Sequence, residues 1–444
     1  MWMRRGLWLL LLTLGCSSGD RTDPPAPALE PVGPTAMGAS ERRGSADDPL
    51  AGLDRDPEPD EYVQAPTTGP AASPTTVAAA VPPHGCVALA EAPVTIWPRP
   101  GPAAITAIGR AFVVAAYAPG EHGGEELVLL HVSPDSAPRP LRTAVLERPQ
   151  VGERTAAPGL ATVDNRRVLV VAIDGAGRVL GGQVVVSEPS AQLTLTPLGE
   201  GADTRFIPAV WASSRLLAVA WTEGGATPMR TRLVTLGPDL SVASRRDVTP
   251  TSMGASAPVF ARGPGEPTLF FVDARAGVSP ILRVVLRGDG SPGTATVARP
   301  VGTVTSPPRI AVANANGVTH VAYTAVGNLA TTAVGLVRLD GEAPPTAIVP
   351  GTGYGPLHVD AAAGPAAVIF AADAPKEEPP GSPRQVHLRV SDAAGLGPAL
   401  VFEGPDGRAS LVAVARAADG TVGVVFRSGQ GIYAAWARCD DEGG

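Results

Sequence analysis

Short apolar runs alternate with polar turns along most of the chain, and the alternation repeats about every fifty residues. The best-kept part of the repeat is an apolar run closed by an acidic turn, as in Leu336 to Gly341. The acids that close the copies are separated by 53, 51, 50, 51, 52 and 48 residues. These acids are Asp135, Glu188, Asp239, Asp289, Asp340, Asp392 and Asp440. Such regular spacing indicates a structural repeat.

Each repeat predicts four strands. A proline followed by a short apolar run comes first, as in Pro208 to Ala212, and a denser run such as Val219 to Trp221 follows. The denser runs are apolar at nearly every position, as in strands covered on both faces. The run before the acidic turn and a mixed run after it complete the set. Four strands in about fifty residues is typical of a β-propeller blade.

The number of repeats raises the question of how the ring closes. Six full repeats extend from Pro102 to about Glu403, but the seventh begins near Ser410 and stops at Asp440 after three strands. A fourth strand is available before Pro102, in either Val87 to Leu89 or Val94 to Trp97. The sequence therefore predicts an all-β, seven-bladed propeller over 86–440, with its last blade closed by an N-terminal strand.

Two of the three cysteines, Cys86 and Cys439, lie where this closing strand meets the last blade. Cys86 precedes Pro102 by 16 residues, as Asp340 precedes Pro356. We predict a disulfide between Cys86 and Cys439, which would close a long loop and contribute on the order of 4 to 5 kcal/mol. The alternative is two buried, unpaired thiols.

The N-terminus has the pattern of an export signal over residues 1–15. Arg4 and Arg5 precede a short apolar core, Leu7 to Leu12, that cannot span a bilayer. Gly15-Cys16 resembles the lipobox of bacterial lipoproteins, which implies a lipid on Cys16, although Thr13 replaces the usual leucine. The alternative is an ordinary signal peptide with an incidental cysteine. Residues 16–85, rich in proline and alanine, predict a disordered tether.

Charge and motifs exclude several classes of function. The net charge of −7 argues against a nucleic-acid partner. The six histidines show no zinc-ligand spacing, and we find no phosphate loop, dinucleotide fingerprint or nucleophile elbow. We therefore expect no cofactor, no metal and no assigned catalytic residue.

In a propeller, loops of one class emerge on one face, so polar loop residues from different blades would surround one mouth of the central channel. We predict a candidate binding face there. Its residues are His122, Arg154, Asp174, Arg205, Glu223, Asp273, Arg275, Tyr354, Arg408 and Arg427. The competing interpretation is that these side chains are polar because loops contact water.

The runs Val219 to Glu223 and Ile432 to Asp440 resemble the degenerate repeats of exported bacterial β-propeller lipoproteins. The resemblance implies a binding or scaffolding module at the cell envelope. We expect it to be a monomer that is held to the membrane by its lipid and has a protein or glycan partner. The alternative hypothesis is a propeller hydrolase or lyase acting on polysaccharide, with carboxylates at the channel mouth as acid and base.

Overall fold

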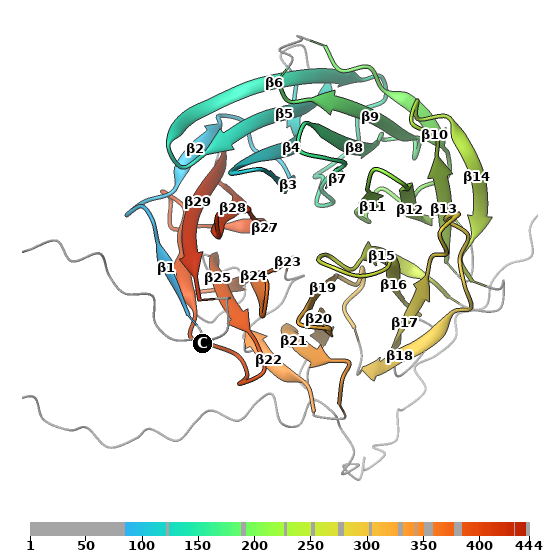
Figure 1. The fold of residues 1–444 in the computed structure, drawn as a ribbon. Coiled ribbons are helices and arrows are strands. Elements are labelled where there is room, and N and C mark those ends of the chain that lie inside the picture. Colours follow the sequence, from blue (N-terminus) through green and yellow to red (C-terminus); the bar gives the residue numbers. More distant parts are fainter. Residues whose placement is uncertain are drawn as a thin grey trace, which may run out of the picture. The chain divides into compact units, whose positions relative to one another are not determined.

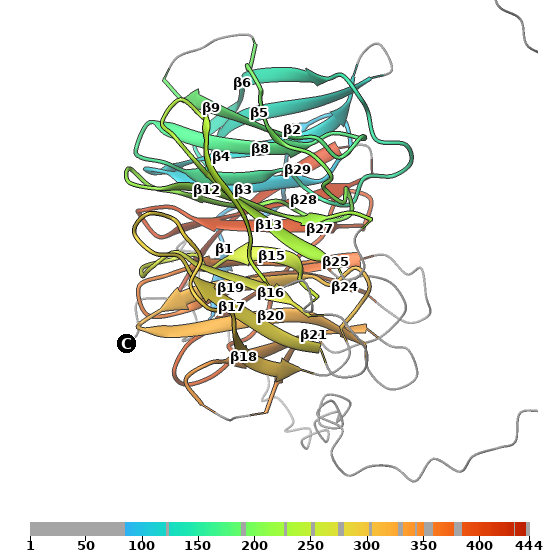
Figure 2. The same ribbon diagram turned by 90° about the vertical axis from the view of Figure 1, so that its right-hand side faces the viewer.

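The computed structural model describes residues 85–120, 124–187, 192–225, 229–249, 254–273, 279–301, 304–326, 332–341, 344–349, 358–376, 384–429 and 431–440. These residues form a ring of seven antiparallel sheets around a central axis (Figure 1). In the side view the strands extend between two faces that carry the loops (Figure 2). The predicted seven-bladed propeller is therefore confirmed.

Six blades each consist of four consecutive strands paired in sequence order. Blades 1 to 3 contain β3 (Ala103–Ile108), β4 (Ala111–Pro119), β5 (Glu125–Ser133), β6 (Ser136–Leu146); β7 (Gly159–Thr162), β8 (Arg167–Ile173), β9 (Val179–Val185), β10 (Thr196–Gly199); β11 (Ala209–Ala212), β12 (Leu217–Glu223), β13 (Arg230–Leu236), β14 (Val242–Asp247). Blades 4 to 6 contain β15 (Ser256–Phe260), β16 (Thr268–Val272), β17 (Ser279–Val285), β18 (Thr296–Val301); β19 (Ile310–Ala315), β20 (Val318–Val326), β21 (Thr332–Arg338), β22 (Thr346–Val349); β23 (Val359–Ala363), β24 (Val368–Pro375), β25 (Arg384–Ser391), β26 (Leu400–Phe402).

The seventh blade combines the two ends of the described chain. β27 (Ser410–Arg416), β28 (Thr421–Ser428) and β29 (Gly431–Cys439) form its inner three strands. Both predicted closing segments pair with β29: β1 (Cys86–Ala88) beside its end, and β2 (Val94–Trp97) beside its start. The outer strand is thus divided in two, where the sequence offered two alternatives for one strand.

The predicted disulfide is confirmed. Cys86 and Cys439 lie directly opposite each other in the β1–β29 ladder and are covalently bonded across 353 residues of sequence. Asp440 donates its backbone N–H to the Gly85 carbonyl beyond the bond, at 2.9 Å. Covalent and hydrogen bonds together therefore join the first and last strands of the ring.

The core is divided among the interfaces between neighbouring blades. Each apolar cluster of the described residues draws on two adjacent sheets, including blade 7 with blade 1. There, Trp436 of β29 packs on Phe112 of β4 with ring centroids 5.3 Å apart. The second strand of each blade contributes most to these clusters, because its side chains are buried on both faces of the sheet. Burial of one such side chain contributes about 1.5 to 3 kcal/mol.

In some of the blades, the acidic residue in the turn between the third and fourth strands caps backbone N–H groups of the same turn. The Asp239 carboxylate accepts the Ser241 N–H, and Asp289 accepts the Ser291 N–H at 2.9 Å. Asp392 accepts the N–H groups of Ala394 and Gly395, so turn chemistry explains these three acids. In other copies the side chain has a different role: Asp340 forms an ion pair with Arg338, and Glu188 lies outside the described residues.

Within the described residues, no helix has the length and apolar character needed to cross a membrane. The predicted signal peptide, Cys16 and the predicted tether up to residue 84 lie outside the described residues, so these three assignments stay predictions.

Candidate functional site in the central channel

The innermost strands of all blades begin at one end of the ring, which we call the upper face. Loops between second and third strands reach the same end, as predicted. The Asp373 N–H at the end of β24 donates to the His358 carbonyl just before β23, and the Thr324 N–H of β20 donates to Arg309 just before β19. Polar residues of both loop classes therefore lie at one mouth of the channel.

Two predicted residues of this face are tightly held by their own surroundings. Arg154 is buried and donates through Nε and Nη2 to Glu125, at 2.6 and 2.8 Å. Its guanidinium lies 3.9 Å from the centre of the Tyr117 ring. Burial raises the pKa of Tyr117 to about 12, and the Arg154 charge opposes this rise. Asp174 is fully buried and accepts two backbone N–H groups and Nε of Arg178.

Four other predicted residues form pairs nearer the surface. Arg205 binds Asp203 at 2.6 Å, Glu223 binds Arg232 at 3.1 Å, and Arg427 binds Glu153. The Arg408 N–H donates to the Asp406 carboxylate at 3.1 Å. The first three side chains form ion pairs within a blade or between neighbours, and the described residues do not gather the four into one cluster.

The structure describes the remaining predicted residues of this face in less detail or not at all. Asp273 is buried at the end of β16, where its N–H donates to the Pro280 carbonyl. His122, Arg275 and Tyr354 lie outside the described residues. The assignment of this face as a binding surface stays a prediction.

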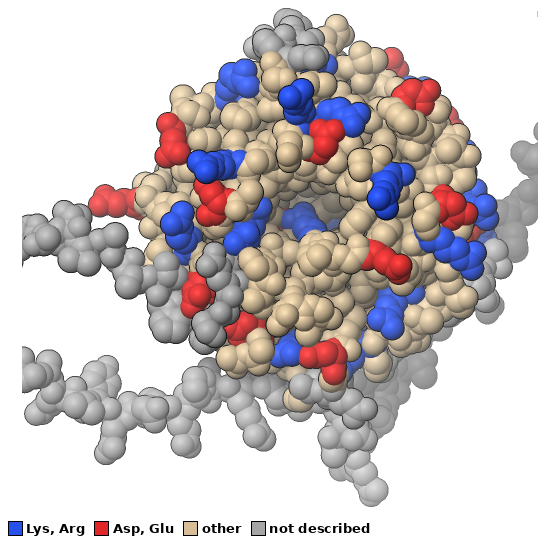
Figure 3. Space-filling view, viewed as in Figure 1, with Lys and Arg blue, Asp and Glu red and all other residues tan. Residues whose placement is uncertain are grey.

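The axis of the ring holds a cavity of about 410 Å³, lined by the innermost strand of every blade. Its walls are mainly alanine, valine, leucine, isoleucine and proline side chains, and the charged residues among them are Arg262, Arg309, Asp360 and Arg416. The space-filling view shows a central hollow with cationic atoms inside it (Figure 3). A cavity of this size with apolar walls and few polar groups has the form of a ligand site.

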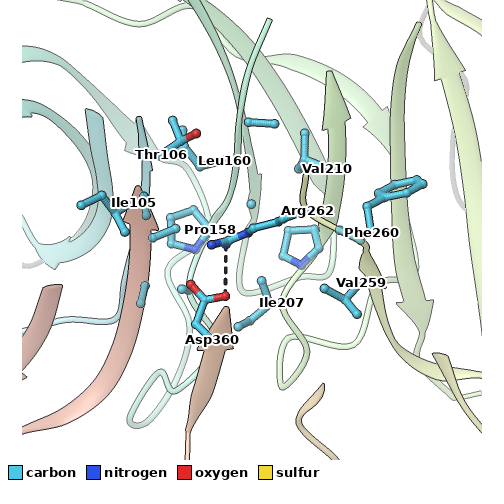
Figure 4. A pocket seen from close by; sticks show the side chains of 18 of the residues that line it. Ile105, Thr106, Pro158, Leu160, Ile207, Val210, Val259, Phe260, Arg262 and Asp360 are labelled. Atoms are coloured by element: carbon cyan, nitrogen blue, oxygen red, sulfur yellow. Dashed lines mark ion pairs between the residues drawn. The ribbon is translucent and has the colours of Figure 1, made fainter. Parts of the chain in front are cut away.

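Arg262 extends across this cavity from blade 4. Its guanidinium donates to the carbonyls of Ala361 and Val414, at 2.7 and 2.6 Å, and binds Asp360 at 3.1 Å (Figure 4). The other Asp360 oxygen accepts the Val414 N–H at 2.9 Å. Burial raises the pKa of Asp360, although Arg262 and the backbone donors oppose the rise. The contacts join blades 4, 6 and 7 inside the channel and use the polar atoms of both side chains.

At the upper end, Arg309 and His358 occupy equivalent positions just before the inner strands of blades 5 and 6. The Arg309 side chain is buried and reaches the Thr155 hydroxyl of blade 2, at 3.5 Å. His358 Nδ1 lies 3.2 Å from Asp373 Oδ2, and Arg384 lies 3.2 Å from the other carboxylate oxygen. Burial alone would raise the pKa of Asp373, but His358 and Arg384 hold it below its usual range.

A second recess of about 370 Å³ lies between blades 2 and 3. Glu223, Arg232 and Arg245 line it, together with the buried ring of Trp221. The predicted Glu223 thus borders this recess and not the central cavity.

The sequence predictions missed the residues inside the channel. Asp360 and Arg262 stand at or just beyond innermost strands whose other positions are mostly apolar, and this exception to the repeat was a detectable signal. His358 and Arg309 had no such signal, because they follow the repeated proline segments like ordinary loop residues. In the part of the chain that the structure describes, no three His, Cys, Asp or Glu side chains cluster as a metal site would require.

No family model matches the chain, and no curated protein matches it significantly. Among solved structures, the chain is similar to the lectin BP39L from Burkholderia pseudomallei, with 16% identity and a TM-score of 0.54. That match covers 76% of this chain and 96% of the lectin. The WD40 domain of Toxoplasma gondii coronin matches with 11% identity and a TM-score of 0.50, over 80% of this chain and 87% of that one. At such identities the likeness is one of fold alone.

Proposed function

We propose that the protein is a binding module of the bacterial envelope, held by a lipid on Cys16, whose glycan or protein ligand enters the central cavity from the upper face. The observation that carries this proposal is the 410 Å³ cavity, because every blade contributes to it and its few charged groups converge on the axis. The Cys86–Cys439 bond supports an oxidising compartment outside the cytoplasm.

A glycan is the ligand class to test first. Fold likeness to a lectin does not assign a ligand, but it sets the order in which ligands are tried. The size of the cavity also suits one or two sugar rings better than a folded protein domain.

Binding is better supported than hydrolysis by paired carboxylates. Asp360 is the one acidic side chain among the described residues that line the cavity, and Arg262 and the Val414 N–H occupy its oxygens. Glycoside hydrolysis ordinarily needs two carboxyl groups, one on each side of the bond that breaks. The described cavity supplies no second one.

A glycan array followed by calorimetry on the best hit tests the proposed site. Val210 faces the cavity (Figure 4), so Val210→Trp should fill it and weaken binding at least about 10-fold. Val145→Trp is the matched control, since Val145 is 70% exposed on β6 and lies outside the cavity lining. Unchanged affinity in Val210→Trp would place the ligand elsewhere.

The lipid anchor has its own test. Cys16→Ser should move the protein from the membrane fraction to the soluble fraction of cells and abolish labelling by a fatty-acid analogue. Retention of label in Cys16→Ser would refute lipidation at this residue.

The His358–Asp373 pair supports a second candidate function, a polysaccharide lyase. A histidine oriented by a carboxylate can act as a general base, and Arg309 beside it could neutralise an acidic sugar. Incubation with acidic polysaccharides would then produce unsaturated ends that absorb in the ultraviolet, and His358→Asn would abolish that signal. Absorbance that does not rise would leave binding as the function.

A further inference from the structure

The Arg309 guanidinium is buried with very little to bind. Its side chain is 7% exposed, and Nε has no hydrogen-bond partner among the described residues. The distance of 3.5 Å from Nη2 to Thr155 Oγ1 is longer than an ordinary hydrogen bond. Burial lowers the pKa of Arg309 to about 10, and the charge of Asp373 opposes this. A buried cation with so few partners favours an anion beside it.

His358, on the neighbouring blade, also has an unused nitrogen. A carboxylate can only accept hydrogen bonds, so contact with Asp373 places the ring proton on Nδ1. The other ring nitrogen, Nε2, is buried and has no partner in the described part of the chain. A hydroxyl group can both donate and accept a hydrogen bond, so it can pair with this nitrogen.

The hydrogen bonds of Asp373 are made to groups other than the Arg309 side chain. Its carboxylate is fully buried and accepts bonds from the His358 N–H, Arg384 and the Leu411 N–H as well as from the imidazole. These donors satisfy its oxygens from the protein side. Arg309 and His358, in contrast, both line the central cavity.

We infer that Arg309 and His358 form a recognition site for a sugar acid, in which Arg309 binds the carboxylate and His358 Nε2 forms a hydrogen bond with a neighbouring hydroxyl. The planar guanidinium suits a carboxylate, and Thr155 across the channel offers a further hydroxyl to the ligand. The inference names a ligand class for the cavity and therefore rests on the proposed function.

Thermal unfolding and calorimetry of the full mature chain test it, with D-glucuronate, D-glucose and acetate as probes at matched ionic strength. A ligand that binds only the folded protein raises its Tm. Glucuronate should raise the Tm of the wild type, acetate should raise it less, and glucose should leave it unchanged. Arg309→Met should weaken glucuronate binding about 10- to 100-fold, and Arg309→Lys less than that.

Arg246→Met serves as the matched control, because Arg246 is an exposed arginine of the outer strand β14, outside both the cavity lining and the predicted binding face. It should bind glucuronate like the wild type. Equal effects of acetate and glucuronate would overturn the sugar-acid assignment, as would equal glucuronate affinity in Arg309→Met and the wild type.

The two proposals fail in different ways. If neutral oligosaccharides bind the wild type and Arg309→Met equally while glucuronate binds neither, the glycan-binding function stands and this inference falls. If glucuronate stabilises the wild type but not Arg309→Met while no oligosaccharide binds, the sugar-acid site stands and the glycan-binding function falls.

Discussion

Two arginines of the upper face, Arg154 and Arg309, are about equally buried, at 6% and 7% exposure, yet they have opposite surroundings. Arg154 binds Glu125 through two nitrogens and stacks on Tyr117. Among the described residues, the Arg309 side chain has one long contact, to Thr155, the residue next to Arg154 in the chain. Each guanidinium has one buried nitrogen without a partner among the described residues, Nη1 of Arg154 and Nε of Arg309, but only Arg154 is bonded to a carboxylate there.

This difference teaches that burial of a charge does not by itself mark a ligand site. What matters is whether the protein has supplied the opposite charge. At Arg154 it has, so we expect the residue to act on stability. At Arg309 no carboxylate of the described residues is bonded to the guanidinium, so we expect the residue to act on ligand binding.

The most direct test of the comparison exchanges each arginine for methionine. Arg154→Met leaves the Glu125 carboxylate largely buried and without its ion pair, so it should lower the free energy of unfolding by about 3 to 5 kcal/mol. Arg309→Met removes an unpaired buried charge and should be neutral or slightly stabilising. Urea unfolding measures both. A loss in Arg309→Met as large as that in Arg154→Met would contradict the comparison.

The buried histidine His320, which has a hydrogen-bond partner, allows the comparison to be tested by changing the pH. His320 of blade 5 contacts Ser391 Oγ at 3.2 Å, and burial lowers its pKa to about 4, with Arg338 acting in the same direction and Asp340 and Asp392 opposing. Between pH 6.5 and 4 the unfolded chain therefore binds a proton that the folded chain does not. The His320 contribution to stability should be constant above this window and fall through it by roughly 3 kcal/mol as the pH is lowered.

The contribution of His320 can be isolated by comparing the wild type with His320→Gln. The difference in unfolding free energy between pH 6.5 and 4 should be smaller in the variant. Identical pH slopes in the two proteins would show that His320 does not titrate in this way.

Tyr117 and Tyr323 allow the same comparison, between a buried polar group with a partner and one without, for two hydroxyl groups. Both rings are buried, and burial raises the pKa of each to about 12. The Tyr117 hydroxyl accepts the Ile173 N–H of the next blade at 2.8 Å, whereas the Tyr323 hydroxyl has no partner among the described residues. Tyr117→Phe should cost about 1 to 2 kcal/mol in denaturant unfolding, and Tyr323→Phe should cost nothing or stabilise. Equal losses would argue against this distinction.

The smallest effect is expected at Arg205, the exposed partner of Asp203. The Arg205 side chain is 58% exposed, so Arg205→Ala should change stability by no more than about 0.5 kcal/mol. A ligand found on the array should bind this variant with unchanged affinity. A clear loss of affinity would extend the site from the cavity to the loops of the upper face.

The fold was largely predictable because its signals are local. Apolar spacing and acidic turns repeat within fifty residues, and a proline marks the start of most inner strands. Even the disulfide followed from one missing strand. The outer strand of blade 7 was harder to predict from the sequence, because whether β1 or β2 pairs with β29 depends on packing. In the structure both pair with it.

The candidate site was much less predictable. Loop position predicted that Arg154 and Asp174 belong to the loops of the upper face, but it could not show that Glu125 and Arg178 bind them there. Arg309 and Thr155 meet across the axis although 154 residues separate them. Contacts of this kind depend on the diameter of the ring, which no local pattern encodes.

The bond between Cys86 and Cys439 also determines how the ring responds to mechanical force. A pull on the chain before Gly85 reaches the sheet at Cys86, the first residue of a strand only three residues long. Hydrogen bonds alone would let such a strand peel away from β29 one pair at a time. Because the first residue is bonded across to the last strand, the load passes to the backbone of β29, and the blade bears tension without opening.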